Sequence, residues 1–284
     1  MNKYIKEMRM HHYVKNLLVL LPVFFSGRFF TWENIVHALF AFLAFCFVSS
    51  SVYVLNDIRD REKDRLHPKK KSRPIASGDI SMKRAWFLFG VIVVLCAACN
   101  MAVFSPWGTA IIVLYFLLNV LYSAGIKNIP IADICILVSG FVLRVMYGAI
   151  VTDCTVSNWL YLMITVISFY LALGKRRGEL RLGGKTRNVL CFYTHEFLDK
   201  NMYMFLAMAN IFYALWSADS AGVKAAHPRL LVWTVPAVIL LSLRYSFDIE
   251  SESDADPVDV IMRDKVLIGF GICYAATMCA IFYL

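Results

Sequence analysis

Long apolar segments alternate with short polar segments along nearly the whole chain. The apolar segments are about 20 residues long, which is the length that an α-helix needs to cross the hydrocarbon core of a bilayer. They lack the strict alternation of barrel strands, and a helix satisfies its own backbone hydrogen bonds in lipid. The pattern therefore predicts an all-α polytopic membrane protein with nine transmembrane helices, at residues 16–30, 34–55, 83–104, 107–124, 129–150, 157–174, 201–218, 228–246 and 265–284. The first of these is interrupted by Pro22, Ser26 and Gly27.

Composition agrees with this assignment. Of the 284 residues, 60% are hydrophobic, whereas soluble domains contain about 45–50% apolar residues. No tandem repeat is visible, so we interpret residues 1–284 as a single membrane domain. Its polar segments, at about 56–82, 125–128, 175–200 and 247–264, are expected to be loops on one side of the membrane.

The distribution of positive charge predicts which side that is. With the N-terminus inside, all but four of the 29 lysines and arginines lie at the inner face. Arg28, Lys224 and Arg229 lie outside, and Arg144 lies within a span. Such asymmetry indicates a multi-pass protein of the cytoplasmic membrane, with its N-terminus and long loops in the cytoplasm. The net charge of +9 is therefore a topological signal, and we expect no nucleic acid partner.

An acidic cluster follows the second apolar segment. Asn56, Asp60 and Asp64 are spaced i, i+4, i+8, and Asp57 lies on the same face if the helix continues past Leu55. Like charges at this spacing repel each other, so a cation is expected among them. Mg²⁺ prefers oxygen ligands and typically binds one or two carboxylates together with substrate phosphates. The alternative is a solvated loop, in which these acids pair with the basic residues Arg59, Arg61, Lys63 and Arg65.

A basic run comes directly after the acids. Lys70 and Arg73 lie in the segment HPKKKSRPIASG, at 67–78. Charge-assisted hydrogen bonds from such side chains are suited to phosphate oxygens. Acids and bases together therefore predict a site for a metal-bound diphosphate.

These motifs resemble the UbiA superfamily of intramembrane prenyltransferases. The segment from Asn56 to Asp64 is similar to the first aspartate-rich motif of that superfamily. The finer matches are closest to the decaprenyl-phosphate phosphoribosyltransferase branch. They comprise Lys15-Asn16; His67, Pro68, Lys70, Arg73, Pro74, Ile75, Ala76 and Gly78; Tyr122, Ser123 and Lys127; Asp133, Ile134 and Cys135; Gly140, Phe141, Leu143, Arg144 and Gly148; and Gly174, Lys175, Arg176, Glu179 and Leu180. The resemblance runs from about residue 9 to the C-terminus.

The resemblance implies a bundle of nine helices around a central cavity that opens to the cytoplasm. It also implies Mg²⁺-dependent transfer of phosphoribose from phosphoribosyl diphosphate to a polyprenyl phosphate, in contact with membrane lipid. In this interpretation the metal ligands and catalytic acids are Asp57, Asp60 and Asp64, supported by Asn56. The substrate-binding residues are Lys15 and Asn16 near the lipid phosphate, Lys70 and Arg73 on the donor, and Tyr122, Lys127, Lys175 and Arg176 around the cytoplasmic opening.

Two charged residues lie inside the fifth predicted span. Ionisable groups in membrane helices usually face a cavity or a partner. Asp133 and Arg144 are 11 residues apart, about 16 Å along a helix, so they cannot pair directly. Asp133, near the cytoplasmic end, is expected to join the metal site. Arg144 is either a structural charge paired with an acid elsewhere or a cation that lines the cavity.

One departure from the superfamily pattern bears on the substrate. Its prenyltransferases typically carry a second DxxxD motif, but here Asp133 is followed at i+4 by Leu137. The loss favours a lipid monophosphate over a second diphosphate. Two alternatives remain: prenyl transfer from an isoprenoid diphosphate to an aromatic or other acceptor, and transport of an anionic solute or lipid. The sequence leaves open the polyprenyl length and whether the chain forms homo-oligomers.

Overall fold

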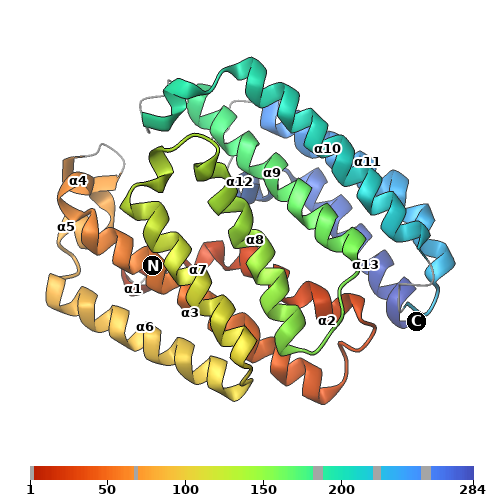
Figure 1. The fold of residues 1–284 in the computed structure, drawn as a ribbon, viewed down its shortest axis with the longest axis horizontal. Coiled ribbons are helices and arrows are strands. Elements are labelled where there is room, and N and C mark those ends of the chain that lie inside the picture. The colour runs from red at the N-terminus through yellow and green to blue at the C-terminus, as the bar shows by residue number, and fades with distance from the viewer. Residues whose placement is uncertain (1–2, 67–69, 182–187, 220–224, 251–256) are drawn as a thin grey trace. The chain divides into compact units, whose positions relative to one another are not determined.

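A computed structural model describes residues 3–66, 70–181, 188–219, 225–250 and 257–284. Within these ranges the chain is nearly all helical and contains no strand, which confirms the predicted all-α class (Figure 1). Of the positions considered above, His67, Pro68, Lys224 and residues 182–187 of the 175–200 loop lie outside the described residues. The chain packs as two compact units, the first made of residues 1–21, 30–124 and 143–154, and the second of residues 22–29, 125–142 and 155–284.

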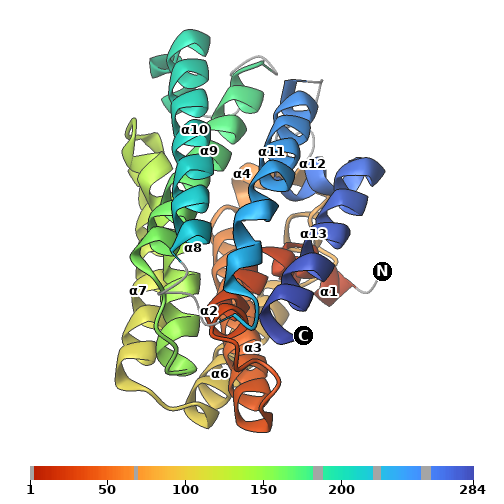
Figure 2. The ribbon, with the colours of Figure 1, turned by 90° about the vertical axis from the view of Figure 1, so that its right-hand side faces the viewer.

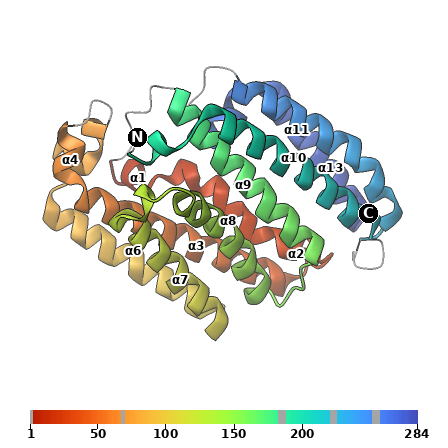
Figure 3. The ribbon, with the colours of Figure 1, turned by 45° about the horizontal axis from the view of Figure 1, so that its top comes forward.

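The first unit is built around one long helix. Its helices are α1 (Lys3–Met8), η1 (Met10–Leu20), α3 (Trp32–Arg59), α4 (Arg61–Leu66), η2 (Lys70–Ser72), α5 (Pro74–Ser77), α6 (Met82–Ala102), α7 (Pro106–Ala124) and the second half of α8 (Ala132–Val151). Helices α3 and α6 lie side by side and run antiparallel (Figures 1 and 3). The helices η1 and α7 also pack on α3.

Small residues allow this close packing around α3. Ala38, Ala41, Ala44 and Cys46 are buried along it. Small side chains in membrane helices let neighbouring backbones approach closely. A still closer approach occurs at Gly148 on α8, where an added Cβ would lie 1.9 Å from the carbonyl oxygen of Val19 on η1. Only glycine fits at that position.

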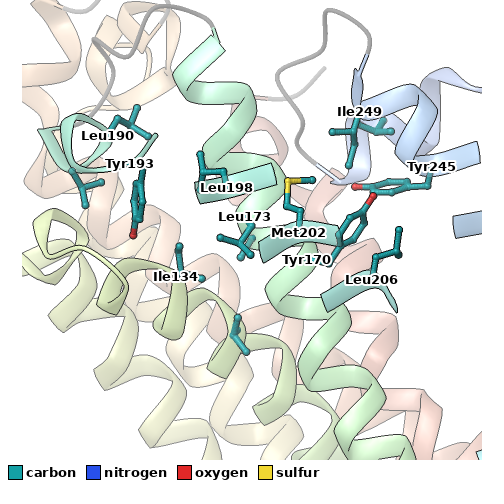
Figure 4. Close-up of a cluster of buried hydrophobic side chains, with 14 of the residues drawn as sticks. Ile134, Tyr170, Leu173, Leu190, Tyr193, Leu198, Met202, Leu206, Tyr245 and Ile249 are labelled. Carbon is teal, nitrogen blue, oxygen red and sulfur yellow. The ribbon is translucent and has the colours of Figure 1, made fainter. Parts of the chain in front are cut away.

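The second unit is a group of long helices with its own core. It contains most of α2 (Leu21–Phe25), η3 (Ile126–Asn128), the first half of α8, α9 (Asn158–Arg181), η4 (Asn188–Phe192), α10 (His195–Ala218), η5 (Pro228–Thr234), α11 (Val235–Glu250), α12 (Pro257–Arg263) and α13 (Lys265–Tyr283). Helices α9 and α10 pack along each other, and α11 packs on α13 (Figure 2). Leu173 of α9, Met202 of α10 and Ile249 of α11 belong to the shared apolar cluster (Figure 4).

Seven helices in the described part of the chain are long and apolar enough to cross a membrane. They are α3, α6, α7, α8, α9, the continuous segment Pro228–Glu250, and α13. The first predicted span is instead broken into η1 and the five-residue α2, and Ser26 and Gly27 follow in a turn. The span predicted at 201–218 falls within α10, which is long enough but is made less apolar by residues such as Asn201 and Asn210. The chain is a multi-pass membrane protein, while the count of nine spans stays a prediction.

Two predicted loops contain more helix than expected. Helix α3 continues to Arg59, and α4, η2 and α5 follow within the 56–82 segment. Helix α9 runs to Arg181 and therefore carries Lys175 and Arg176 as helical residues. In the described residues, Asp57, Asp64, Lys175 and Arg176 are thus carried on helical backbone.

Candidate functional site

Two of the predicted acids are joined by one guanidinium in the first unit. The Nη1 of Arg73 lies 2.6 Å from Oδ2 of Asp64 and 3.0 Å from Oδ1 of Asp57. Both carboxylates are buried. Arg73 therefore bridges the acidic cluster and the basic run that the sequence placed beside it.

The local fold explains how three short segments bring these groups together. Helix α3 ends at Asp60, whose backbone (φ −92°, ψ 8°) is no longer helical, and α4 begins at the next residue. Asp57 thus lies on the last turn of α3, while Asp64 lies on α4. Arg73 is the N-cap of α5, Pro74 is its first residue, and Gly78 ends it in the left-handed region at φ 91°. Proline suits a first helical position and glycine a left-handed end, so the RPIAxG pattern fixes where Arg73 stands.

Arg9 holds Asp57 from the other side. Its Nη2 lies 2.7 and 2.8 Å from the two carboxylate oxygens of Asp57, and the guanidinium stacks over the ring of Tyr53. Burial lowers the pKa of Arg9, but the charge of Asp57 and the hydrogen bonds to it, with smaller contributions from Tyr53 and Glu7, together leave that pKa above its ordinary value. The Arg9 backbone is left-handed (φ 52°, ψ 47°) at the turn between α1 and η1. Such a conformation is costly for a side chain larger than glycine and is often found at functional sites.

Glu7 is a third acid at this site. Its side chain is 1% exposed, and neither carboxylate oxygen receives a hydrogen bond. Burial raises the pKa of Glu7 to about 8, and the adjacent Asp57 carboxylate adds to the effect, while Arg9 and Arg73 oppose it. Neither Glu7 nor Arg9 was selected from the sequence, because both lie in a basic arm that reads as solvated. Both residues also lie far from the acidic motif along the chain, so no helical spacing relates them to it.

The other residues of the first motif surround the buried pair. Lys70 places its Nζ 3.9 Å from Oδ1 of Asp64 and is otherwise exposed. Asn56 and Asp60 are half-buried at the end of α3. The structure therefore brings Asp57, Asp64, Lys70 and Arg73 together, with Asp60 and Asn56 on the adjoining turn.

Arg144 of α8, in the same unit, contacts a separate set of buried polar and aromatic side chains. Its Nε donates to Oδ1 of Asn16 at 2.8 Å and its Nη2 to the hydroxyl of Tyr115 at 3.0 Å. The guanidinium also lies 5.0 Å from the ring centroids of Phe45 and Tyr115. Asn16 is buried, and its Nδ2 donates to the Sγ of Cys46. Arg144 thus links α8 to η1, α7 and α3 through neutral and aromatic groups, an arrangement that neither sequence alternative specified.

Asp133 belongs to the second unit, where it is paired. Its Oδ2 lies 2.5 Å from Nε of Arg176, and its Oδ1 accepts a hydrogen bond from the hydroxyl of Tyr193 at 2.6 Å. Arg176 also reaches Glu179 at 2.7 Å. Asp133 and Arg176 are both fully buried. The structure therefore gives Asp133 and Arg176 a shared ion pair, which the sequence did not reveal because 43 residues separate them.

The Tyr193 hydroxyl also fixes the start of α8. It accepts a hydrogen bond of 2.7 Å from the backbone N–H of Ile131, which is left-handed at φ 67°. Burial raises the pKa of Tyr193 to about 12, and its hydrogen bond to Asp133 acts in the same direction. The hydroxyl therefore stays protonated and holds Asp133 at physiological pH.

The remaining predicted contacts are half-buried and divided between the units. Lys15 on η1 and Tyr122 near the end of α7 lie in the first unit. Lys127 on η3 and Lys175 on α9 lie in the second.

The acids of the first unit suit a magnesium ion that is bound partly by protein carboxylates and partly by substrate phosphates. No three acidic, histidine or cysteine side chains converge on a metal position in the residues that the structure describes. Asp57 and Asp64 nevertheless offer hard oxygen donors that one cationic group already bridges, and Glu7 offers unsatisfied oxygens beside them. Mg²⁺ commonly takes one or two carboxylates and completes its shell with water and substrate phosphates. The donor set is therefore adequate for Mg²⁺ with a diphosphate.

Comparison with known sequences identifies similar proteins over nearly the full chain. A model of the UbiA prenyltransferase family matches residues 19–259. A decaprenyl-phosphate phosphoribosyltransferase of Corynebacterium glutamicum is 35% identical, over 93% of this chain and 81% of its own. Proteins of the same name from Mycolicibacterium smegmatis and Mycobacterium tuberculosis are 32% and 30% identical, over 98% and 96% of this chain and 92% of their own length in each case.

Solved structures support the fold. A UbiA homolog from Archaeoglobus fulgidus bound to GPP and Mg²⁺ has a TM-score of 0.71 at 22% identity, covering 98% of this chain and 97% of its own. A UbiA homolog from Aeropyrum pernix has a TM-score of 0.67 at 16% identity, with coverage of 94% and 99%.

Proposed function

This chain belongs to the UbiA prenyltransferase family, and we propose that it transfers phosphoribose from phosphoribosyl diphosphate to a polyprenyl phosphate. The observation that carries the proposal is the group of decaprenyl-phosphate phosphoribosyltransferases that are 30–35% identical over more than nine tenths of this chain. In the reaction, a phosphate oxygen of the lipid forms a bond to the anomeric carbon of the ribose. The bond from that carbon to the diphosphate breaks, and diphosphate leaves with its electron pair.

The paired acids of the first unit are proposed to hold the donor through Mg²⁺. Asp57, Asp60 and Asp64 are the proposed ligands, directly or through water, and Asn56 supports them from the last turn of α3. When bound, the ion neutralises charge that develops on the departing diphosphate. Arg73 already holds the Asp57 and Asp64 carboxylates close together, which supports their use as a pair of ligands.

The basic side chains are proposed to bind the phosphates directly. Arg73 presents a planar group with several donors, and Lys70 presents a point charge at the same carboxylate. Fixed donors at a developing anion stabilise the transition state. A donor phosphate that binds next to Asp57 and Asp64 is therefore within reach of the Arg73 guanidinium, which already contacts both carboxylates.

The acceptor contacts remain predictions. Lys15 and the neighbouring Asn16 are proposed to lie near the lipid phosphate, with Asn16 oriented by Arg144. Tyr122, Lys127 and Lys175 are proposed phosphate contacts on the cytoplasmic side. Arg176 is engaged by Asp133 and Glu179, which favours a structural role for it and for Asp133. We also propose the inward N-terminus, the nine spans and the cytoplasmic opening of the cavity.

A label-transfer assay tests the proposal. Purified protein in detergent is given phosphoribosyl diphosphate labelled in the ribose, a polyprenyl phosphate and Mg²⁺. We expect label to enter the lipid phase, and to be lost with EDTA or with Asp57→Asn. Asp153→Asn is a matched control, because Asp153 is exposed and left-handed (φ 47°), a conformation that asparagine tolerates. Product formation in detergent, without two compartments, would also exclude transport as the sole activity.

Prenyl transfer is the second candidate, because the Archaeoglobus fulgidus homolog is bound to GPP and Mg²⁺. Leu137, at the place of a second motif acid, argues against it. The same preparation with a labelled prenyl diphosphate and an aromatic acceptor decides between them. Prenyl turnover without phosphoribosyl transfer would overturn the proposal.

A further inference from the structure

We propose that Glu7 supplies an additional carboxylate to the divalent cation bound at Asp57. This inference rests on the proposed function, since it assumes a metal at the first acidic motif. It adds a ligand from the N-terminal helix α1, which lies outside that motif.

The carboxylate of Glu7 lacks any donor in a place where it cannot be hydrated. Its side chain is 1% exposed, and neither oxygen accepts a hydrogen bond. A buried polar group without a partner destabilises the fold, and more so when it is charged. Native structures rarely keep such a group unless a ligand, an ion or water satisfies it.

The nearby cations are already used by another carboxylate. Arg9 binds both oxygens of Asp57, and Arg73 binds Asp57 and Asp64. Glu7 and Asp57 therefore face each other as two acceptors. A proton, a water molecule or a cation between them satisfies both.

The position of Glu7 is held by contacts along α1. Lys3 donates to the carbonyl oxygen of Asp79 at 2.9 Å, and Lys6 donates to that of Ser72 at 3.0 Å. At the end of the helix, Ser50 of α3 donates to the carbonyl oxygen of Met8 at 2.9 Å. These bonds fasten α1 to α3 and to the segments around α5, so Glu7 is held against Asp57 by packing rather than by an ion pair of its own.

One substitution separates a bound cation from the neutral ways of satisfying Glu7. If Glu7 only donates a proton to Asp57, glutamine replaces it, because the amide N–H₂ can donate to Asp57 in the same position. If Glu7 binds a divalent cation, glutamine removes a charged ligand. Glu7→Gln should therefore keep the fold and weaken metal binding.

The experiment measures Mn²⁺ binding by electron paramagnetic resonance of the free ion, on the full chain in detergent with neither substrate present. Mn²⁺ takes the same oxygen ligands as Mg²⁺. Glu7→Gln should weaken Mn²⁺ binding at least about tenfold, since even residues that only support a metal ligand cost about 10–100-fold. Glu7→Asp, which keeps the charge, should lose less. Glu62→Gln is the matched control and should bind as wild type, because Glu62 is exposed on the neighbouring α4.

Two further measurements assign every outcome. Saturating Mn²⁺ should raise the melting temperature of wild type more than that of Glu7→Gln. Each variant is compared with itself without metal, so a change in its intrinsic stability does not affect the result. Equal Mn²⁺ affinity and equal thermal shift for wild type and Glu7→Gln, with binding lost in Asp57→Asn, would overturn this inference alone. If wild type binds no Mn²⁺ even after phosphoribosyl diphosphate is added, or if Asp57→Asn binds it normally, the metal site of the proposed function fails and Glu7 fails with it.

Discussion

Two guanidinium groups, those of Arg73 and Arg9, hold the buried carboxylate of Asp57. The sequence predicted that Asp57 and Arg73 serve one metal-diphosphate site, but it did not predict the direct hydrogen bond between them, 16 residues apart. The contact of Asp57 with Arg9, 48 residues away, depends on a left-handed turn that no apolar pattern encodes. Glu7 was missed for a related reason, because charge in an N-terminal arm predicts solvation unless the packing of α1 is known. Local spacing therefore identified the motif, and tertiary structure supplied the rest of its shell.

Arg73→Lys tests the bridging role at this scale. Lysine keeps the charge but cannot present a planar set of donors to two carboxylates and a phosphate. Hydrogen bonds to charged groups contribute about 1.5–3 kcal/mol each, so the KM for phosphoribosyl diphosphate should rise about tenfold or more. Arg59→Lys, the same change at an exposed position on α3, should leave it unchanged. Equal KM values for the two variants would remove Arg73 from the donor site.

Asp133→Asn tests whether the buried pair is structural. Removing one partner of a buried ion pair typically costs about 3–5 kcal/mol, because the other charge is left uncompensated. Glu179 still contacts Arg176, so a loss of about 3 kcal/mol in unfolding free energy is expected, measured by thermal unfolding in detergent. Asp153→Asn again serves as the exposed control. A variant with unchanged stability and lost Mn²⁺ binding would restore the metal-binding role that the sequence first suggested.

At the scale of elements, apolar length predicted the long helices well and the interrupted ones poorly. The segments at 34–55, 83–104, 107–124 and 129–150 correspond to α3, α6, α7 and α8 within a few residues. The segment at 16–30 did not form one helix, since Pro22 and Ser26-Gly27 allow the chain to change from η1 to α2 and then to a turn. The span predicted to end at residue 174 continues as helix α9 to Arg181, because the last two turns are polar and were therefore assigned to a loop. Hydropathy reports burial in lipid and is insensitive to helix that extends into water.

The contact between η1 and α8 gives a prediction at this scale. Gly148→Ala would place a methyl group 1.9 Å from the carbonyl oxygen of Val19, so the two helices must move apart. Overpacking usually costs about 1–3 kcal/mol, and the backbone position of the obstacle places this case at the upper end. Gly90→Ala on α6 is the control, because its added Cβ meets nothing within 4 Å. That control should be neutral or slightly stabilising, since alanine is the better helix former.

Thermal unfolding of both glycine variants in the same detergent measures the difference. Displacement of η1 also shifts Asn16, which Arg144 holds from α8. Gly148→Ala should therefore lose transfer activity together with stability. A melting temperature equal to that of Gly90→Ala would show that η1 and α8 are not in this close contact.

For the whole molecule, the sequence predicted the class and the family, because both depend on features repeated or matched along the entire chain. Apolar runs set the membrane class, and motifs from residue 15 to residue 180 set the family, which the comparisons confirm. The division into two compact units was not predicted, since it follows from contacts between segments far apart in the chain. Orientation in the membrane rests on charge asymmetry and stays a prediction.

Cysteine labelling tests that orientation. Cys191 is exposed on η4, in a segment predicted to be cytoplasmic, and Thr155 is exposed between α8 and α9, in a segment predicted to be external. In a background with Cys154→Ser, which removes the other thiol of that segment, a membrane-impermeant maleimide should label intact cells only after Thr155→Cys. In inverted vesicles the background protein should be labelled, and Cys191→Ser should abolish most of that labelling. Thiols on lipid-facing positions such as Cys273 should react little, because a membrane-impermeant maleimide stays in water and does not enter the hydrocarbon region. The reverse pattern would place the acidic motif outside the cell, away from any cytoplasmic phosphoribosyl diphosphate, and the proposed donor would have to be abandoned.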